Sequence, residues 1–241
     1  MPLISVITIT LNDQPRLPQT IASVAGQTGA SVEHIIVDGN GNDGTADWLR
    51  QNSFPLVRWV SESDTGIYDA MNKGLDIARG QWIYFLGAGD ELLPGSFDRI
   101  APLLTNNLDA LVGHVRMVGG GRFIGTFSEA MLVSNLIHHQ AAFYNRQLFD
   151  TFQYDISMKA MSDYELNLLL YLHRKDVCVI DLDMALCDVQ GISAGLMQSL
   201  WESNRIKYRH LGLWQGTRYG AILAWKYGMI YLKKLKKNYL Q

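Results

Sequence analysis

Cysteine is scarce in this chain: Cys178 and Cys187 are the only two in 241 residues, and their spacing matches no metal-binding motif. Two cysteines exclude a disulfide-rich scaffold, and we expect both to be free thiols in a reducing cytosol. No uninterrupted apolar run reaches the roughly 18 residues of a membrane-spanning helix. The sequence opens directly into a strand pattern, so a signal peptide is not expected.

Acidic residues are almost missing from the C-terminal end. Residues 201–241 contain nine Lys and Arg but a single acid, Glu202, which gives this tail a net charge of +8 against −10 for the rest of the chain. Aromatic and aliphatic side chains are interleaved with its lysines, so we expect a helix that lies in a membrane interface. A solvated basic helix end is the alternative. Nucleic-acid binding is not expected, because no stacking platform accompanies the lysines.

Strand and helix patterns alternate through the first 90 residues. Such alternation predicts βαβ units and an α/β fold with a mainly parallel sheet. The expected strands are Leu3–Thr10, Glu33–Val37, Leu56–Val60 and Trp82–Leu86. One expected helix ends near Ala25, and two others cover Thr45–Gln51 and Tyr68–Arg79. Asp38, Asp64 and Asp90 each follow a strand, which places three carboxylates along the sheet edge where ligands bind in this architecture.

The second half of the sequence is less regular. Gly119, Gly120 and Gly121 indicate a hairpin within Val112–Phe127, and Ala141–Tyr144 is a further candidate strand. Ser162 to His173 is predicted to be helical, with Ser162 and Glu165 forming a capping box. No internal repeat or low-complexity linker is visible, so we expect one domain with a C-terminal appendage.

A loop rich in Gly, Asn and Asp follows the second expected strand, in the segment HIIVDGNGNDGT at residues 34–45. A carboxylate accepts hydrogen bonds but donates none, so Asp38 is suited to pair with an N–H group of a nucleotide base. The glycines would let the backbone approach a ligand closely. An ordinary Asp-Gly turn is the alternative.

The run DTGIYDAMNKG at residues 64–74 is more specific. Tyr68, Asn72 and Asp76 share one helical face at i, i+4 spacing. The helix start offers backbone N–H groups to an anion, and Lys73 could offset phosphate charge. For the charged residues of this helix, a solvated face is the alternative interpretation.

Together with GQWIYFLGAGD at residues 80–90, these segments resemble the donor-binding core of family 2 glycosyltransferases, and the resemblance extends over about residues 3–190. It implies a GT-A fold, a Rossmann-like sheet flanked by helices, over residues 1–200, with a donor half at about 1–113 and an acceptor half at about 114–200. Residues 201–241 would form the basic aromatic helical tail.

The same resemblance implies a function. The chain would transfer a sugar, with inversion, from a nucleotide-diphosphate sugar to a glycan acceptor that we expect to be lipid-linked. The motif style is that of bacterial exopolysaccharide, O-antigen and colanic-acid assembly on the inner face of the cell membrane. The donor-binding residues implied are Thr10, Asn12, Asp38, Asp64, Gly66, Tyr68, Asn72, Lys73, Ala88 and Gly89.

The family's acidic metal motif is reduced in this chain. Gly87 and Gly89 stand where the family usually carries Asn or an acid, and only Asp90 remains as the expected ligand of Mn²⁺ or Mg²⁺. His139, in a family-like His-Gln segment, is a second candidate ligand or a site residue. For Asp90 the alternative is a helix N-cap, and for His139 it is a structural role.

Asp163, in the segment SDYEL, matches the family's acid on the acceptor side. The resemblance implies that it is the catalytic base of a single displacement. The alternative is that Asp163 only places charge at a helix N-terminus.

Two other functions compete with this one for the whole chain. A non-catalytic binder of nucleotide sugars or glycans is the main alternative, and Gly87 and Gly89 are its best support. A nucleotidyltransferase is disfavoured, because residues 12–15 replace the Gly-rich, basic loop of that class.

Overall fold

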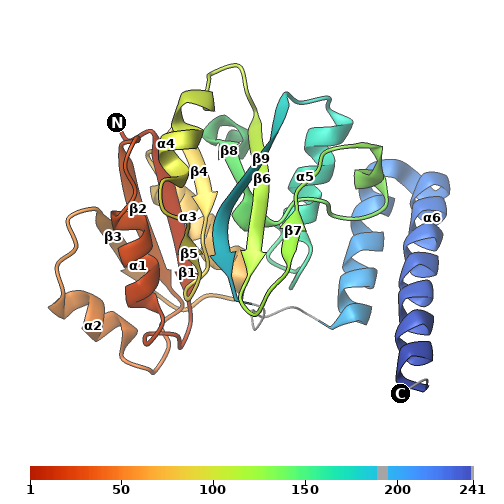
Figure 1. Ribbon diagram of the computed structural model, residues 1–241, viewed down its shortest axis with the longest axis horizontal. Coiled ribbons are helices and arrows are strands. Elements are labelled where there is room, and N and C mark those ends of the chain that lie inside the picture. Colours follow the sequence, from red (N-terminus) through yellow and green to blue (C-terminus); the bar gives the residue numbers. More distant parts are fainter. Residues whose placement is uncertain (189–194, 240–241) are drawn as a thin grey trace.

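The computed structural model describes residues 1–188 and 195–239, with side chains up to residue 229. Within these residues one nine-stranded sheet has the order β3-β2-β1-β4-β8-β6-β9-β5, and β7 pairs with β6. Helices cover both faces of this sheet (Figure 1). One face packs on α3, α5 and the start of α6, and the other on α1, α2 and α4.

The first half forms the parallel part of the sheet. Its strands are β1 (Ile4–Thr10), β2 (Val32–Asp38), β3 (Val57–Ser61) and β4 (Trp82–Phe85), and its crossover helices are α1 (Leu17–Ala25), α2 (Thr45–Gln51) and α3 (Ile67–Ile77). The β-branched, apolar strand β1 is buried except for Ile9, as a strand with helices on both faces should be. The predicted elements are confirmed to within about three residues at each end.

The second half mixes antiparallel and parallel pairing. It consists of β5 (Glu91–Leu92), α4 (Ser96–Ile100), β6 (Ala110–Met117), β7 (Arg122–Ile124), β8 (Ala142–Asn145), α5 (Ser162–Leu172) and β9 (Val177–Cys187). Single-turn helices join them: η1 (Ala101–Leu103), η2 (Glu129–Leu132), η3 (His139–Ala141) and η4 (Arg146–Asp150). The predicted hairpin is confirmed as β6–β7.

Sequence reasoning missed β9, although this 11-residue strand pairs parallel with β6. The alternation of Asp181 and Asp183 with Leu182 and Met184 was the available signal. Cys178 and Cys187 lie on this strand and are free thiols, as predicted.

The predicted capping box at the start of α5 is wrong. The N-cap residue is Met161, and the Ser162 hydroxyl accepts a hydrogen bond from the Asp155 backbone N–H at 2.7 Å. The Glu165 carboxylate instead accepts hydrogen bonds from Arg209 and His210 on α6. These contacts turn the Glu165 carboxylate toward α6 and away from the Ser162 backbone N–H that a capping box would satisfy.

The C-terminal helix α6 (Leu196–Tyr239) is a helical hairpin. Gly212 has φ 72° and ψ 179°, which interrupts the helix and reverses the chain (Figure 1). Residues 196–211 form a first arm, and residues 213–239 form a second arm that lies beside it. The arms approach closely, since a Cβ on Gly216 would lie 2.6 Å from Cδ1 of Tyr208. The reversal follows from a backbone angle that glycine adopts without strain.

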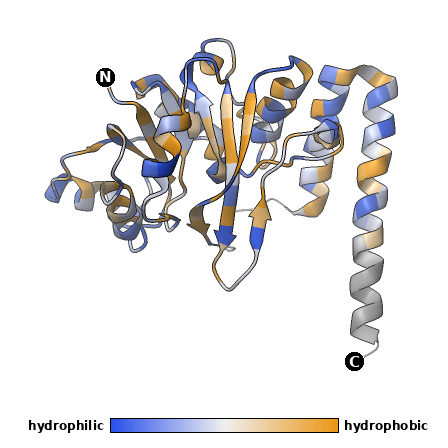
Figure 2. Cartoon of the chain, turned by 45° about the horizontal axis from the view of Figure 1, so that its top comes forward, coloured by the Kyte–Doolittle hydropathy of each residue, from blue (hydrophilic) through white to orange (hydrophobic). Residues whose placement is uncertain are grey.

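The first arm packs against the body, whereas the second arm is largely exposed. Ile206 and Lys207 of the first arm are fully buried, and Leu213, Trp214 and Trp225 of the second arm are 75%, 89% and 67% exposed. Apolar segments are visible along both arms in Figure 2. The predicted tail boundary at residue 200 thus falls inside a helix that joins the body. Residues 233–237, the predicted lysine cluster, lie outside the described side chains.

Among the described residues, no helix combines the length and the apolar character needed to cross a bilayer.

Candidate active site

The ends of β1 and β2 form a corner with two unpaired polar atoms. Asp38 is 1% exposed, and its Oδ2 accepts a hydrogen bond from the Ser61 hydroxyl at 2.6 Å. Its Oδ1 and the Oγ1 of the neighbouring Thr10 are buried without a hydrogen-bond partner. Such atoms are rare in folded proteins and call for a specific explanation. Both belong to the predicted donor-binding set, and a ligand N–H and a ligand oxygen would satisfy them.

The glycine-rich loop is held beside this corner by Asn12 and Asp64. Asn12 has φ 54°, and its Oδ1 accepts a hydrogen bond from the backbone N–H of Asn42 at 2.8 Å. Asp64 lies so close to Gly39 that a Cβ there would be 2.5 Å from its Oδ2. Burial raises the pKa of Asp64, and the nearby Asp38 charge adds to this shift. Asp38 and Asp64 therefore lie close together at the ends of β2 and β3.

The start of α3 is ordered by short contacts within its own loop. The Gly66 N–H donates to Oδ1 of Asp64 at 3.0 Å. Lys73 donates to the Ser63 carbonyl oxygen at 2.7 Å and lies 3.4 Å from the Glu62 carboxylate. Through these contacts Lys73 stabilises the β3–α3 loop.

Asn72 is also occupied by the protein itself. Its Nδ2 donates to the Tyr154 carbonyl oxygen at 2.9 Å, and its Oδ1 accepts from the Tyr154 N–H at 3.0 Å. This side chain joins α3 to the segment before α5. Tyr68, on the same predicted helical face, stacks on the Tyr154 ring, so this face packs against the protein.

Asp90 follows β4 and is nearly buried, at 9% exposure. Its Oδ1 accepts a hydrogen bond from the Asp188 backbone N–H at 2.7 Å, and its Oδ2 accepts one from Gln140 Nε2. Burial raises the pKa of Asp90 above the ordinary range. Asp90 does not cap a helix, because α4 begins at Ser96 with Gly95 as its N-cap.

The two glycines beside Asp90 are explained by what packs against them. A Cβ on Gly87 would lie 2.7 Å from Oδ2 of Asp90 and 3.1 Å from Nε2 of Gln140. A Cβ on Gly89 would lie 2.9 Å from Cζ of Arg16, and Gly89 also has φ 87°. The Gln140 amide and the Arg16 guanidinium thus occupy the space that acidic side chains at positions 87 and 89 would take. Ala88 lies between the two glycines, and its backbone N–H donates a hydrogen bond to the Ile9 carbonyl oxygen at 3.4 Å.

Arg16 is a cation beside Asp90 that sequence reasoning missed. It donates to both carboxylate oxygens of Asp13, at 2.7 and 2.6 Å, and to Asp188 at 2.8 Å. The hydrogen bond with Asp13 is the main reason that the pKa of Arg16 is raised. The hydrogen bond from Gln140 to Asp90 has no local sequence signal, because the two residues are 50 positions apart.

A divalent cation can be tested against these groups. Among residues 1–188 and 195–229, no three His, Cys, Asp and Glu side chains are grouped as metal ligands. Asp90 offers one carboxylate, whose oxygens already accept two hydrogen bonds. One carboxylate fits Mg²⁺ or Mn²⁺ only if phosphate oxygens and waters supply the other ligands.

His139 stacks on His138, with ring centroids 4.8 Å apart. Burial lowers the pKa of His139 to about 3 and that of His138 to about 4. Both rings are therefore neutral at pH 7, the form in which a histidine binds metals. The hydrogen bond to Asp90 comes from Gln140, the residue after His139, and not from His139 itself.

Asp163 lies in the first turn of α5 and is 9% exposed. Tyr68 donates a hydrogen bond to its Oδ1 at 3.1 Å, and Asn135 donates one to its Oδ2 at 3.0 Å. Burial raises the pKa of Asp163 to about 6, although both hydrogen bonds favour the charged form. A carboxylate with this pKa is ionised at pH 7 and basic enough to accept a proton.

Asn135 belongs to a chain of polar groups behind the carboxylate. Its Oδ1 accepts a hydrogen bond from Asn167 at 3.1 Å, and Oδ1 of Asn167 accepts one from the Tyr144 hydroxyl at 2.8 Å. Sequence reasoning found none of these three, because no spacing links them. Tyr68 was predicted to bind the donor, and the structure joins it to Asp163.

Comparison with known proteins identifies the family. The family model described as Glycosyl transferase family 2 matches residues 5–163, more than half of the chain. This chain belongs to glycosyltransferase family 2. It is 35% identical over 176 residues to a PGL/p-HBAD biosynthesis glycosyltransferase of Mycobacterium bovis, covering 69% of each chain. It is 32% identical over 178 residues to an uncharacterized glycosyltransferase of Mycobacterium tuberculosis, covering 68% of this chain and 67% of that protein.

Solved structures confirm the GT-A fold of this family 2 glycosyltransferase. S. aureus TarS 1-349 in complex with UDP matches with a TM-score of 0.67 and 18% identity, over 86% of this chain and 64% of that one. The mannosyltransferase PcManGT from Pyrobaculum calidifontis, in complex with GDP-Man and Mn²⁺, matches with a TM-score of 0.64 and 15% identity, over 99% and 83%. This chain spans less than two thirds of the length of the TarS chain.

Proposed function

We propose that this glycosyltransferase transfers a sugar from a nucleotide-diphosphate sugar by a single, inverting displacement with Asp163 as the base. The observation that carries the proposal is the Asp163 carboxylate, oriented by two donors and given a pKa of about 6 by burial. It would take the proton of the acceptor hydroxyl as that oxygen bonds to the anomeric carbon. The bond to the diphosphate oxygen breaks, and a nucleoside diphosphate leaves with the electron pair.

The donor would bind across the ends of β1, β2 and β3. The unpaired Oδ1 of Asp38 and Oγ1 of Thr10 are the polar atoms that a nucleotide would satisfy. Complexes of the structural neighbours with UDP and GDP-Man support this donor class. The alternative of a non-catalytic binder explains the donor corner equally well but gives no role to Asp163.

The leaving diphosphate would lie beside Asp90. That carboxylate would hold a Mn²⁺ or Mg²⁺ ion together with the phosphates, and the Mn²⁺ in the PcManGT complex supports the use of a divalent cation. When bound, the cation would offset the charge of the departing diphosphate. His139 remains a second candidate ligand, because burial keeps its ring neutral.

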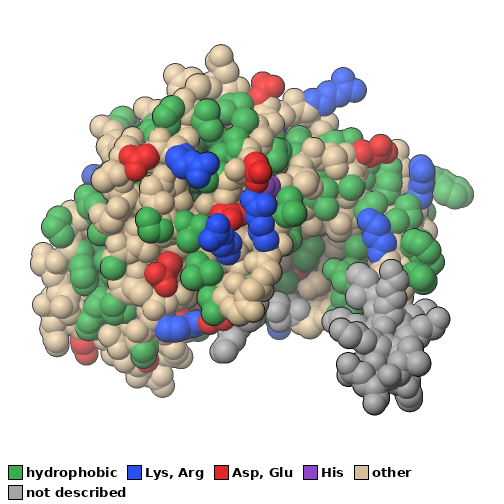
Figure 3. Space-filling model, viewed as in Figure 1, with side chains coloured by type: hydrophobic (Ala, Val, Ile, Leu, Met, Phe, Trp, Pro, Cys, Tyr) green, Lys and Arg blue, Asp and Glu red, His purple; other side chains and the backbone are tan. Residues whose placement is uncertain are grey.

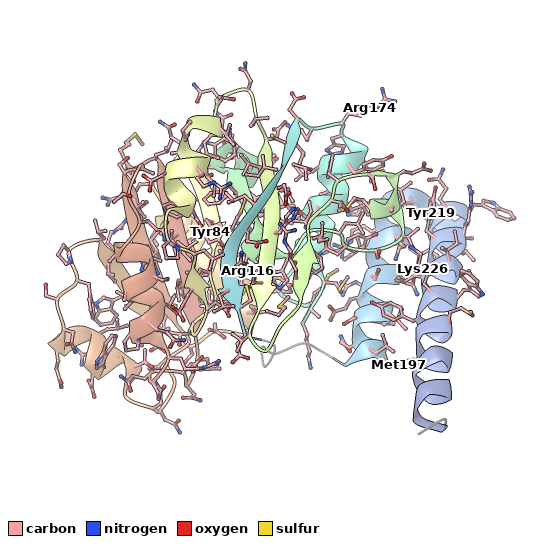
Figure 4. All side chains as sticks on the ribbon, in the orientation of Figure 1. Tyr84, Arg116, Arg174, Met197, Tyr219 and Lys226 are labelled. Carbon is pink, nitrogen blue, oxygen red and sulfur yellow. The ribbon has the colours of Figure 1, made fainter. Side chains whose placement is uncertain are left out.

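We propose a lipid-linked glycan as the acceptor, in bacterial surface polysaccharide synthesis at the inner face of the cell membrane. Trp214 and Trp225 on the second arm are 89% and 67% exposed, as expected of side chains that enter a membrane interface. Hydrophobic and basic side chains are mixed on the hairpin in Figure 3. Figure 4 labels Met197 on the first arm, and Tyr219 and Lys226 on the second.

The decisive experiment measures nucleotide release from a panel of UDP-, GDP- and dTDP-sugars, with Mn²⁺, with Mg²⁺ and with a chelator. We expect one donor to be hydrolysed slowly, and Asp90→Ala to reduce this rate. Asp98→Ala, a substitution of an exposed carboxylate away from Asp90, should leave it unchanged. In the contrary outcome, the protein binds a nucleotide sugar but releases no nucleotide from any donor of the panel, either alone or with an extract that contains acceptors. That result would favour the non-catalytic binder and overturn the proposal.

A further inference from the structure

Glu202 is a buried carboxylate in the first arm, outside the predicted active site. It is fully buried, and its oxygens accept hydrogen bonds from the backbone N–H groups of Lys159, Ala160 and Met161 at 2.8, 2.9 and 3.0 Å. Gln198 Nε2 donates a fourth hydrogen bond at 2.6 Å. A carboxylate accepts at about four lone-pair positions, so these donors match its capacity.

The three backbone donors lie directly before the helix that carries the base. Met161 is the N-cap residue of α5, and Asp163 is the second residue of that helix. Fixing three consecutive peptide groups at this point determines where α5 begins. It therefore determines the position from which the Asp163 side chain leaves the backbone.

The first arm also contacts the residues that directly follow Asp163. Glu165 accepts hydrogen bonds from Arg209 Nη1 at 2.8 Å and from His210 Nε2 at 2.6 Å. Between these contacts, Lys207 Nζ lies 5.4 Å from the centroid of the Tyr164 ring. The first arm thus holds α5 on both sides of Asp163.

We propose that Glu202 is a positioning residue for sugar transfer, which holds the 159–161 backbone so that Asp163 meets the acceptor hydroxyl. This inference rests on the proposed role of Asp163 as the base. A base acts only within hydrogen-bond reach of the proton that it removes. A misplacement of about 1 Å can reduce a rate by about 100-fold, so a distant carboxylate that fixes the helix start can control turnover.

The test is Glu202→Gln in the full chain, assayed with the donor found in the panel. Glutamine keeps the shape but turns an NH₂ group toward backbone N–H donors. We expect kcat to fall by about 10- to 100-fold, with the KM for the donor unchanged, because the donor corner is untouched. Glu129→Gln, at an exposed position in η2, is the matched control and should keep wild-type kcat.

A double mutant separates positioning from general destabilisation. If Glu202 acts through Asp163, adding Glu202→Gln to Asp163→Asn should lower the residual rate by less than about twofold. If Glu202→Gln lowers the rate of Asp163→Asn by the same factor as it lowers the wild-type rate, the inference is overturned. If Glu202→Gln does not fold at the assay temperature, Gln198→Ala removes one donor to the same carboxylate and should lower kcat by a smaller factor.

The outcomes distinguish this inference from the function on which it rests. An inactive wild type contradicts the proposed function. A wild type that is active, loses turnover in Asp163→Asn and keeps its kcat in Glu202→Gln contradicts only the role of Glu202.

Discussion

The N-terminal half, where we propose that the donor binds (the donor half), and the C-terminal half, where we propose that the acceptor binds (the acceptor half), build their polar sites in different ways. In the donor half, Asp38 and Thr10 lie at the ends of adjacent parallel strands, so the βαβ topology alone brings them together. In the acceptor half, Asp163 is held by Tyr68, which is 95 residues away, and by Asn135, which is 28 residues away. The donor corner is thus a product of regular strand pairing, whereas the base is held by side-chain contacts between elements that follow no regular pattern.

This difference predicts distinct kinetic effects in the two halves. A change in the donor corner should weaken donor binding, and a change around Asp163 should slow turnover. Three substitutions test this division and a fourth tests the contact between α5 and α6, in order of decreasing expected effect.

Asp163→Asn should have the largest effect. It removes the proton acceptor and keeps the side-chain shape, so kcat should fall by about 100- to 10,000-fold. Donor binding, measured by thermal shift, should remain as in the wild type. Asp150→Asn, at an exposed position, is the control, and strong donor weakening in Asp163→Asn would break the division between the halves.

Asp38→Asn should act mainly on the donor. A hydrogen bond to a charged group contributes about 1.5–3 kcal/mol, so losing the pairing at Oδ1 should raise the KM for the donor by about 10- to 100-fold. The kcat should change little, because Asp163 is untouched. A fall in kcat at unchanged KM would show that Asp38 does not contact the ground-state donor.

Tyr68→Phe should slow turnover and move its pH dependence. The ionised form of Asp163 is the base, so activity should rise with pH through the pKa of about 6. The Tyr68 hydrogen bond lowers this pKa, so its removal should shift the acid limb of the kcat/KM profile to higher pH. We expect kcat near neutral pH to fall by roughly tenfold. An unchanged acid limb would argue against Asp163 as the titrating base.

Glu165→Gln should have the smallest effect, on stability. The bonds from His210 and Arg209 hold the pKa of Glu165 below its ordinary value, against burial, which raises it. A depressed folded-state pKa contributes stability above the unfolded pKa, near 4.5, and this contribution is lost as pH falls. Urea unfolding at pH 7 should show a loss of about 1–2 kcal/mol that shrinks below pH 4.5. A constant difference across this range would show that the charge of Glu165 is not involved.

Prediction from sequence succeeded where one segment carried the whole signal. The apolar runs gave β1, β2 and β4 nearly to the residue, because buried parallel strands need apolar side chains on both faces. It missed β9, although the alternation at residues 181–184 was a local signal for a strand. It failed at the Ser162–Glu165 capping box because a remote partner decides the contact there: Arg209 binds Glu165. The orienting roles of Asn135, Gln140 and Arg16 were invisible for the same reason.

By itself, the sequence determined the family, the parallel donor half and the candidate acids Asp38, Asp90 and Asp163, because these depend on short motifs with fixed spacing. Only the tertiary structure decided how those acids are held. Burial sets the pKa of Asp163, Arg16 and Gln140 fill the space beside Gly89 and Gly87, and a helix about 40 residues downstream supplies Glu202 to the start of α5. Desolvation and hydrogen bonding depend on which side chains meet in space, and no local pattern encodes that.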